Sequence, residues 1–306
     1  MPKNVYLFIS PHLDDVVLSC GGYISRLAAA GENVIIGTVA TADVPEGTLL
    51  SRQMQWRHII WGQGKTPFVA RRREDAAAAT ILGVRYLHLD FLDAIYRCDA
   101  NNQPLYPINN AHVPIHLYDL KNYEPDLCQK FQQILRARDG CQVRVFCPLA
   151  IGAHVDHIIV RTAVEEVCEP QNIIYYEDFP YVAKTDSIPS SLNLSIKNEN
   201  WLSKTVELAP NEIEARITAA ACHLSQMRIL FPSKLQHLQN RISFHLPIIG
   251  RYLYWPTSSK ASRRRVSLSL RSYISRVGGE RYWFRSAEQI PDMFFISRDG
   301  KDMPKR

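Results

Sequence analysis

The chain has 306 residues, of which 46% are hydrophobic and 22% are charged, and it contains no uninterrupted apolar run of about 18 residues. This composition indicates a globular protein and excludes both a transmembrane segment and a largely disordered chain. The amino terminus lacks the apolar stretch of a secretory signal, and the 7 cysteines are scattered without a C-x-x-C pair. We therefore expect a cytoplasmic protein with reduced thiols.

The formal net charge is +6, and part of it is concentrated in the Ser-rich segment from Lys260 to Arg271. No aromatic-interleaved groove or nucleic-acid motif accompanies these basic residues. We therefore expect a solvated, mobile loop at this position and no nucleic-acid partner. Contact with a phosphate-bearing or membrane-associated substrate is the alternative.

The first predicted elements form a βαβ unit. Residues 5–9 and 34–41 are short, nearly continuous apolar runs, which are typical of strands covered on both faces in a parallel sheet. Between them, residues 17–30 have the pattern of a helix that ends at Gly31. The first forty residues therefore predict two parallel strands joined by a helix.

The same alternation continues along the chain. The further predicted elements are helices at 71–82, 124–138 and 157–167, and strands at 84–90, 143–147 and 173–176. This order predicts a Rossmann-like, doubly wound α/β fold, with a mostly parallel sheet and helices on both faces. In such a fold the ligand binds at the carboxyl ends of the strands.

The last third of the chain is harder to interpret. Residues 183–200 are polar and predict a loop, and a long helix is expected near 210–230. We predict an α/β domain at 1–182 that carries the site, with residues 183–306 as an extension packed on it or as part of one continuous domain.

Polar side chains follow two of the predicted strands. His12, Asp14 and Asp15 come directly after the first strand, and the sequence HVDH, from His154 to His157, follows the strand at 143–147. Both groups therefore belong to the edge where this architecture builds its sites. Two histidines and a carboxylate can hold a metal ion and leave a position open for water.

Each group also has a simpler explanation. Asp14 or Asp15 could accept backbone hydrogen bonds at the start of the following helix, and H-x-x-H spacing is common by chance. Their joint occurrence after two buried strands favours the metal site. Because no G-x-G-x-x-G follows the first strand and no P-loop motif is present, nicotinamide and P-loop enzymes are disfavoured.

These motifs resemble those of the PIG-L or LmbE-like family of zinc-dependent N-acetylglucosaminyl deacetylases, in its bacterial branch. The family's A-H-P-D-D-E reads S-P-H-L-D-D-V here, and its H-P-D-H reads HVDH. The resemblance implies that His12, Asp15 and His157 bind one zinc ion per chain, with iron(II) or another divalent ion as an alternative. It further implies that Asp14 is the general base and that His154 is the protonated partner of the oxyanion and of the leaving amine.

The resemblance extends over most of the chain. It places Arg71 and Asp93 where family members hold sugar hydroxyls, although Arg71 could instead pair with acids on its own helix and Asp93 could cap a turn. The tract YYEDFPY resembles a family signature, and its Glu177 and Asp178 are candidates to contact substrate or to support the ligands. Asp156 could orient a neighbouring imidazole or only begin its helix.

Two departures from the family pattern stand out. Leu13 and Val16 replace the Pro and the final Glu of the first motif, and neither position is expected to ligate the metal. Gly152 stands where family members often have a Tyr, two residues before His154. Oxyanion stabilisation should therefore depend more on His154 and on the metal.

The function implied is removal of an N-acetyl group from an amino sugar or glycoconjugate, which releases acetate and a free amine. Alternatives are an amidase for another N-acyl substrate, a sugar- or metal-binding protein without catalysis, and a non-haem iron oxygenase with the same ligand types. The predicted α/β fold disfavours the oxygenase, and an unligated acid at Asp14 disfavours a pure binding protein. The sequence leaves the exact substrate and the oligomeric state open.

Overall fold

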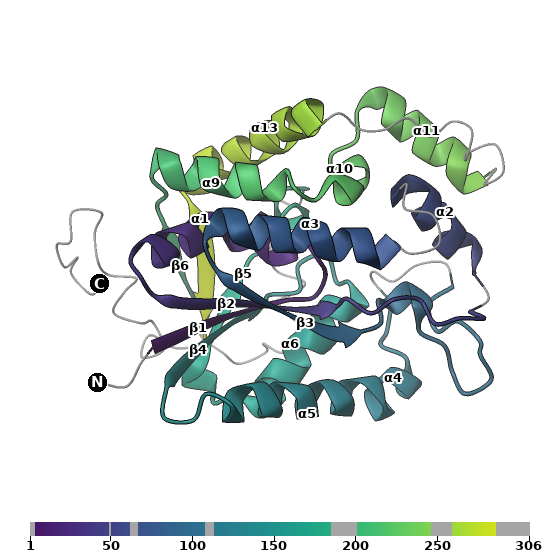
Figure 1. The fold of residues 1–306 in the computed structure, drawn as a ribbon, viewed down its shortest axis with the longest axis horizontal. Coiled ribbons are helices and arrows are strands. Elements are labelled where there is room, and N and C mark those ends of the chain that lie inside the picture. Colours follow the sequence, from purple (N-terminus) through teal and green to yellow (C-terminus); the bar gives the residue numbers. More distant parts are fainter. Residues whose placement is uncertain are drawn as a thin grey trace.

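A computed structural model of the protein describes residues 4–48, 50–61, 67–107, 113–184, 201–245 and 259–285. Its centre is a seven-stranded sheet of order β3-β2-β1-β4-β5-β7-β6 (Figure 1). The strands are β1 (Asn4–Ser10), β2 (Asn33–Ala40), β3 (Arg85–Phe91), β4 (Gln142–Pro148), β5 (Ile173–Tyr176), β6 (Leu202–Val206) and β7 (Glu280–Phe284). The pairings among β1 to β5 are parallel, and those of β7 with β5 and β6 are antiparallel. The predicted α/β fold is confirmed.

The middle strands are buried on both faces, as their continuous apolar sequences predict. All residues of β1 after Asn4 are buried, and β1 lies between β2 and β4. Phe8 of β1 stacks on Phe146 of β4, with ring centroids 4.0 Å apart. This rigid centre fixes the positions at which β1 and β4 end.

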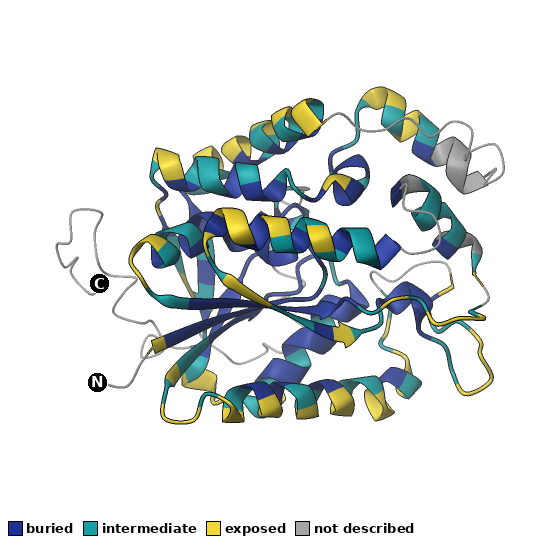
Figure 2. Ribbon diagram, in the orientation of Figure 1, coloured by how far each residue is buried: buried dark blue, intermediate teal, exposed yellow. Residues whose placement is uncertain are grey.

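Helices cover both faces of the sheet. In Figures 1 and 2, α1 and α3 lie on one face and α5 and α6 on the other, each with its buried side toward the strands. The helices before β5 are α1 (Asp15–Ala29), α2 (Arg52–Trp61), α3 (Pro67–Leu82), α4 (Leu117–Lys121), α5 (Tyr123–Arg136) and α6 (Val155–Val167), with short 3-10 helices η1 (Ala94–Tyr96) and η2 (Pro170–Asn172). No helix was predicted at the position of α2, because its weak amphipathic pattern gives no helical signal.

The carboxyl-terminal part adds a further helical layer and two strands to the same sheet. Its helices are α7 (Tyr181–Lys184), α9 (Pro210–Ala220), α10 (Leu224–Leu230), α11 (Lys234–His245) and α13 (Ser259–Val277). The single long helix predicted at 210–230 is wrong, because the chain turns at Ala221 and Cys222 and so separates α9 from α10. Figure 1 shows α9 over α1 and α3, with α13 beyond it. The predicted loop at 183–200 lies almost entirely outside the described residues, and the predicted domain division stays a prediction.

The basic segment from Lys260 to Arg271 is not a loop, contrary to expectation. It lies within α13, where Val266, Leu270 and Tyr273 are buried. Arg263 and Arg271 pair with Glu214 of α9, so part of the positive charge is neutralised within the protein. Among the described helices, none has both the length and the apolar character that a membrane span requires.

Candidate active site

The site lies where the strand order of the sheet reverses, between β1 and β4. His12, Asp14 and Asp15 follow β1, and the loop before His154 follows β4. The ends of the neighbouring strands β3 and β5 are followed by Asp93 and Asp178. Because all these strands are parallel, their carboxyl ends meet at one edge, and the fold brings distant parts of the sequence together there.

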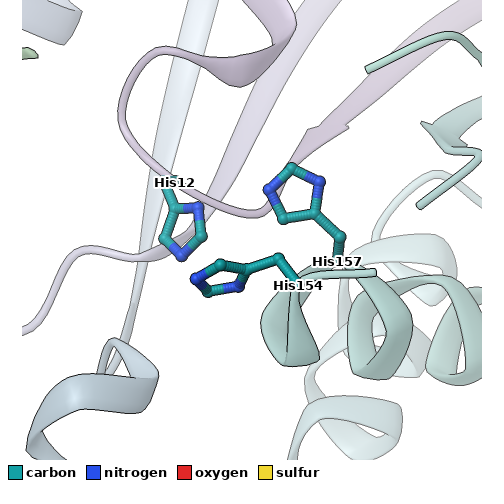
Figure 3. A group of neighbouring side chains, drawn as sticks. All are labelled: His12, His154 and His157. Carbon is teal, nitrogen blue, oxygen red and sulfur yellow. The ribbon is translucent and has the colours of Figure 1, made fainter. Parts of the chain in front are cut away.

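His12, Asp15 and His157 lie within contact distance of one another. The Asp15 Oδ2 atom is 3.1 Å from His12 Nδ1 and 3.2 Å from His157 Nε2. Figure 3 shows the rings of His12, His154 and His157 gathered at this point, and one nitrogen from each lies within 4.8 Å of the others. Four potential ligands from two sequence motifs therefore surround one small volume.

A carboxylate holds the outer nitrogen of two of these rings. His12 Nε2 lies 2.8 Å from Asp156 Oδ2, and His157 Nδ1 lies 2.6 Å from Asp178 Oδ1. The inner nitrogens, His12 Nδ1 and His157 Nε2, are thus directed toward Asp15. Metal-ligating histidines in proteins are oriented in this way, with the second nitrogen donating to a carboxylate.

Electrostatics also couple these groups. Burial opposes protonation of His157, but Asp15 and Asp178 outweigh it and raise the pKa of His157 to about 9. Burial likewise opposes protonation of His12, while hydrogen bonds with Asp15 and Asp156 raise its pKa well above the usual range. Both imidazoles therefore hold protons that a cation would have to displace.

Asp14 differs from Asp15 although the two are adjacent. Asp15 accepts the backbone N–H of His12 at 2.8 Å, whereas the Asp14 side chain makes no hydrogen bond to any described residue and lines the pocket. Asp14 therefore does not cap α1, the simpler role considered for it. Burial and the charge of Asp15 raise the pKa of Asp14 to about 7, against the opposing effect of Arg71.

His154 stands at the amino-terminal end of α6. Its Nδ1 accepts the backbone N–H of Asp156 at 3.2 Å, so the ring proton is on Nε2. Burial and the neighbouring His12 lower the pKa of His154 well below its usual value. This shift favours the neutral ring, which can donate a hydrogen bond through Nε2–H. The protonated partner that the resemblance implies stays a prediction.

The loop that delivers His154 has an unusual backbone. Ala150, Gly152 and Ala153 have φ values of 63°, 90° and 49°, a region that costs non-glycine residues energy. The backbone N–H of Ile151 donates to Asp178 Oδ2 at 2.8 Å, which ties this loop to the end of β5. Gly152, which stands where family members often have a Tyr, thus has a positive φ.

Arg71 and Asp93 both line the pocket, and Arg71 Nη1 lies 4.0 Å from Asp93 Oδ2. The Arg71 guanidinium lies over the ring of Trp61, 4.7 Å from its centroid, and its Nη1 has no hydrogen-bond partner among the described residues. Asp93 also caps η1, where it accepts the N–H of Ile95. Glu74, the helical neighbour considered for Arg71, bonds Ser225 instead.

Residues from other parts of the chain complete the pocket. Tyr181 follows the loop after β5, and the further lining residues that the sequence did not reveal are Arg57, Ile95, Gln226, Ile229 and Leu230. Burial raises the pKa of Tyr181, so its phenol remains protonated. Glu177 lies apart from the histidines, where it accepts hydrogen bonds from Tyr273 and Trp283. Tyr181 ends the tract YYEDFPY, whereas no local pattern in the sequence marks Arg57 or the lining residues of α10.

The donor set fits a divalent metal ion. His157 Nε2 is buried and has no hydrogen-bond partner among the described residues, although it points at Asp15. A buried polar atom of this kind is costly unless another group satisfies it. Two imidazole nitrogens and one carboxylate oxygen are also the ligand types that zinc takes in catalytic sites.

Comparison with known proteins agrees with this geometry. The family model described as PIG-L, GlcNAc-PI de-N-acetylase, matches residues 7–168. The chain is 29% identical over 192 residues to a 2'-N-acetylparomamine deacetylase of Niallia circulans, covering 58% of this chain and 68% of that protein. It is 30% identical over 192 residues to the enzyme of the same name from Streptomyces fradiae, covering 60% of this chain and 59% of that protein.

The fold is also similar to that of a teicoplanin deacetylase crystallised in its zinc-inhibited form. The two are 25% identical with a TM-score of 0.65, and the match covers 91% of this chain and 97% of that one. The likeness therefore includes the carboxyl-terminal part, which lies beyond the family model. Because the family model matches more than half of the sequence, the chain belongs to the PIG-L family of de-N-acetylases.

Proposed function

We propose that this deacetylase hydrolyses the N-acetyl group of an amino sugar or glycoconjugate, using one divalent metal ion, zinc, held by His12, Asp15 and His157. The relatives support the reaction, because both 2'-N-acetylparomamine deacetylases are named for an N-acetylated substrate. The donor set supports the metal, since its outer nitrogens are held by Asp156 and Asp178. When bound, zinc lowers the pKa of its water to about 7 and polarises a carbonyl.

Asp14 is assigned as the general base. Its carboxylate lines the pocket beside Asp15 and is not used in any hydrogen bond to a described residue. It can therefore accept a proton from the attacking water on Oδ1 or Oδ2. With its pKa raised to about 7, the protonated acid can afterwards give that proton to the departing amine nitrogen.

His154 is assigned to the acetyl oxygen. Its Nε2–H is a hydrogen-bond donor at the pocket, where it can stabilise developing negative charge on that oxygen. Arg71 and Asp93 are assigned to the sugar, because each offers polar atoms at the same pocket. The single observation that carries the proposal is the free Asp14 carboxylate beside the three ligands, because a binding protein would not need it.

The proposal is tested by measuring free-amine release from a panel of N-acetylated sugars and glycoconjugates, including 2'-N-acetylparomamine. The metal-loaded protein is compared with a chelator-treated sample. Release of acetate and amine in step with metal content is expected. Release only from substrates with longer acyl chains would contradict the acetyl assignment, and binding without hydrolysis of any substrate would contradict the enzyme.

The role of Asp14 is tested by Asp14→Asn. This change should leave about one metal per chain and reduce kcat by about 10²- to 10⁴-fold, as loss of a general base does. Asp43→Asn is the matched control, because Asp43 is half exposed and pairs with Arg72 outside the pocket. A near-normal rate for Asp14→Asn would remove the base assignment.

A further inference from the structure

We propose that Arg97, braced by Asp119, is a positioning residue for the metal site, because it fixes Asp156 and through it the ring of His12. The inference rests on the ligand set of the proposed function. Arg97 lies after η1, in the connection between β3 and α5, and touches none of the proposed ligands itself. Arg97 lies in neither of the two family motifs, and no pattern in the sequence around it indicates a role.

The contacts form one continuous chain of charged side chains. Arg97 Nη1 donates to Asp156 Oδ1, and Asp156 Oδ2 lies 2.8 Å from His12 Nε2. The backbone N–H of Ala94 donates to the same Oδ2 atom at 3.0 Å. Both oxygens of the Asp156 carboxylate are thus occupied, and the plane of that carboxylate is fixed from two sides.

The guanidinium of Arg97 is held just as firmly on its outer side. Its Nε donates to Asp119 Oδ2 at 2.9 Å, and Tyr106 Oη donates to the same oxygen at 2.8 Å. The guanidinium also lies 4.1 Å from the ring centroid of Tyr123. Arg97 is only 4% exposed and Asp119 only 1%, so water cannot substitute for these contacts.

The consequence at the site is geometric. With Asp156 accepting from His12 Nε2–H, Nδ1 lies on the side of Asp15 and becomes free to bind a cation once its own proton is displaced. Without Arg97, one oxygen of a buried carboxylate loses its donor, and the carboxylate is free to rotate. His12 then loses the constraint that sets its ring orientation, and outer partners of this kind typically affect metal affinity by 10- to 100-fold.

The test measures metal binding rather than turnover. Metal-free full-length protein is titrated with Co²⁺, followed by its visible absorption, and with Zn²⁺ in competition against a chromophoric chelator. Arg97→Met, which removes the guanidinium and keeps similar length, should weaken binding about 10-fold or more. Arg97→Lys retains a charge that can reach Asp156 and should recover part of the affinity.

Arg216→Met is the matched control. Arg216 is also fully buried and pairs with a buried carboxylate, Glu280, but it contacts no residue of the metal site. It should lower the melting temperature and leave metal affinity unchanged. Equal losses of affinity in Arg97→Met and Arg216→Met, or wild-type affinity in Arg97→Met, would overturn the positioning role.

Should Arg97→Met fail to fold, Asp119→Asn provides the same test more gently, since it loosens Arg97 without removing it. A smaller loss of affinity in the same direction supports the proposal, and an unchanged affinity in a folded variant contradicts it. Failure of the wild-type chain to bind Co²⁺ or Zn²⁺ would instead refute the ligand set. The two ideas therefore fail in distinguishable ways.

Discussion

At the scale of single residues, one step along the chain separates two roles at the start of α1. Asp15 is the first residue of the helix and lies against His12 and His157. Asp14 precedes it with a non-helical backbone, φ −175° and ψ −25°, and its side chain lines the pocket without a hydrogen-bond partner among the described residues. The change of backbone conformation between the two residues therefore produces one candidate ligand and one candidate base.

Gly152 is a residue whose lack of a side chain matters for the site. Its φ is +90°, and a Cβ there would lie 2.9 Å from the Tyr181 ring. We predict that Gly152→Ala lowers the free energy of unfolding by about 1–3 kcal/mol more than Gly31→Ala, because overpacking adds to the backbone cost. Gly31→Ala is the control, since Gly31 has φ +76° with nothing within 4 Å.

Gly152→Ala should also lower kcat/KM, because a displaced Tyr181 ring changes the pocket wall. Urea unfolding and steady-state kinetics provide the two measurements. Equal stability losses in the two glycine variants would contradict the predicted collision.

His223, which is not one of the proposed ligands, predicts a pH dependence of stability. The ring is fully buried and neither nitrogen has a hydrogen-bond partner among the described residues, so burial lowers its pKa to about 4. The unfolded chain, with a pKa of about 6.5, binds the proton more readily between these values. Stability due to this group is thus complete above about pH 6.5 and is lost as the pH falls toward about 4.

The size of this effect follows from the shift. A pKa of about 4 in the folded chain corresponds to a loss of up to about 3 kcal/mol between neutral and acidic pH. Urea unfolding at pH 7 and pH 4.5 should show a smaller acid-induced loss in His223→Leu than in the wild type. An identical loss in both proteins would contradict the assignment.

At the scale of elements, the close contact between α1 and the carboxyl-terminal layer depends on small residues. A Cβ at Gly22 would lie 2.5 Å from Leu208 Cδ1 and 2.9 Å from Glu280 Oε1. Glu280 in turn accepts the backbone N–H groups of Gly22 and Tyr23 and pairs with Arg216. This contact joins β7 and α9 to the helix that begins with Asp15.

We predict that Gly22→Ala is destabilising although alanine favours helices. The helical preference contributes about 1 kcal/mol, whereas overpacking beside a buried carboxylate costs about 1–3 kcal/mol and also disturbs its hydrogen bonds. Adding Leu208→Ala should restore part of the loss, because it removes the nearest clashing atom. A double-mutant cycle by thermal unfolding measures this coupling, and strictly additive effects would argue against the contact.

The elements that sequence patterns predicted well are those with a clear pattern of apolar residues. The buried strands β1, β2, β4 and β5 and the helices between them follow from apolar runs and glycine stops. The turn at Ala221 and Cys222 interrupts an otherwise helical sequence without a proline or glycine, so no local signal marks it. The helix α13 was missed because its arginines and serines obscure the buried positions Val266, Leu270 and Tyr273.

At the scale of the whole molecule, the two motifs made the gathering of the candidate metal ligands predictable, but not the groups that support and surround them. Strand ends place His12 and His157 at one edge by topology alone. The partner of Asp156, by contrast, is Arg97, from a separate connection, and the far pocket wall comes from α10. Buried ion pairs and walls depend on tertiary packing, which a single sequence does not display.

Metal removal should destabilise the whole molecule. Because a metal ion that binds only the folded chain stabilises it by mass action, a 100-fold excess over Kd should add about 2.7 kcal/mol to the free energy of unfolding. The affinity should weaken as the pH falls, since protons compete for His157, whose pKa is raised to about 9. Calorimetry with and without chelator measures the stabilisation by metal, and repeating it at pH 6 and pH 8 measures how that stabilisation depends on pH. A melting temperature that does not depend on metal would contradict the prediction.

The most direct measurement for the account is anomalous X-ray diffraction at the zinc edge from crystals grown with one equivalent of Zn²⁺ per chain. We predict one strong peak about 2.0–2.2 Å from His12 Nδ1, Asp15 Oδ2 and His157 Nε2, with the Asp14 carboxylate outside bonding distance. A peak bound instead on the outer side of His12, by Asp93 and Asp156, or no peak near these residues, would contradict it.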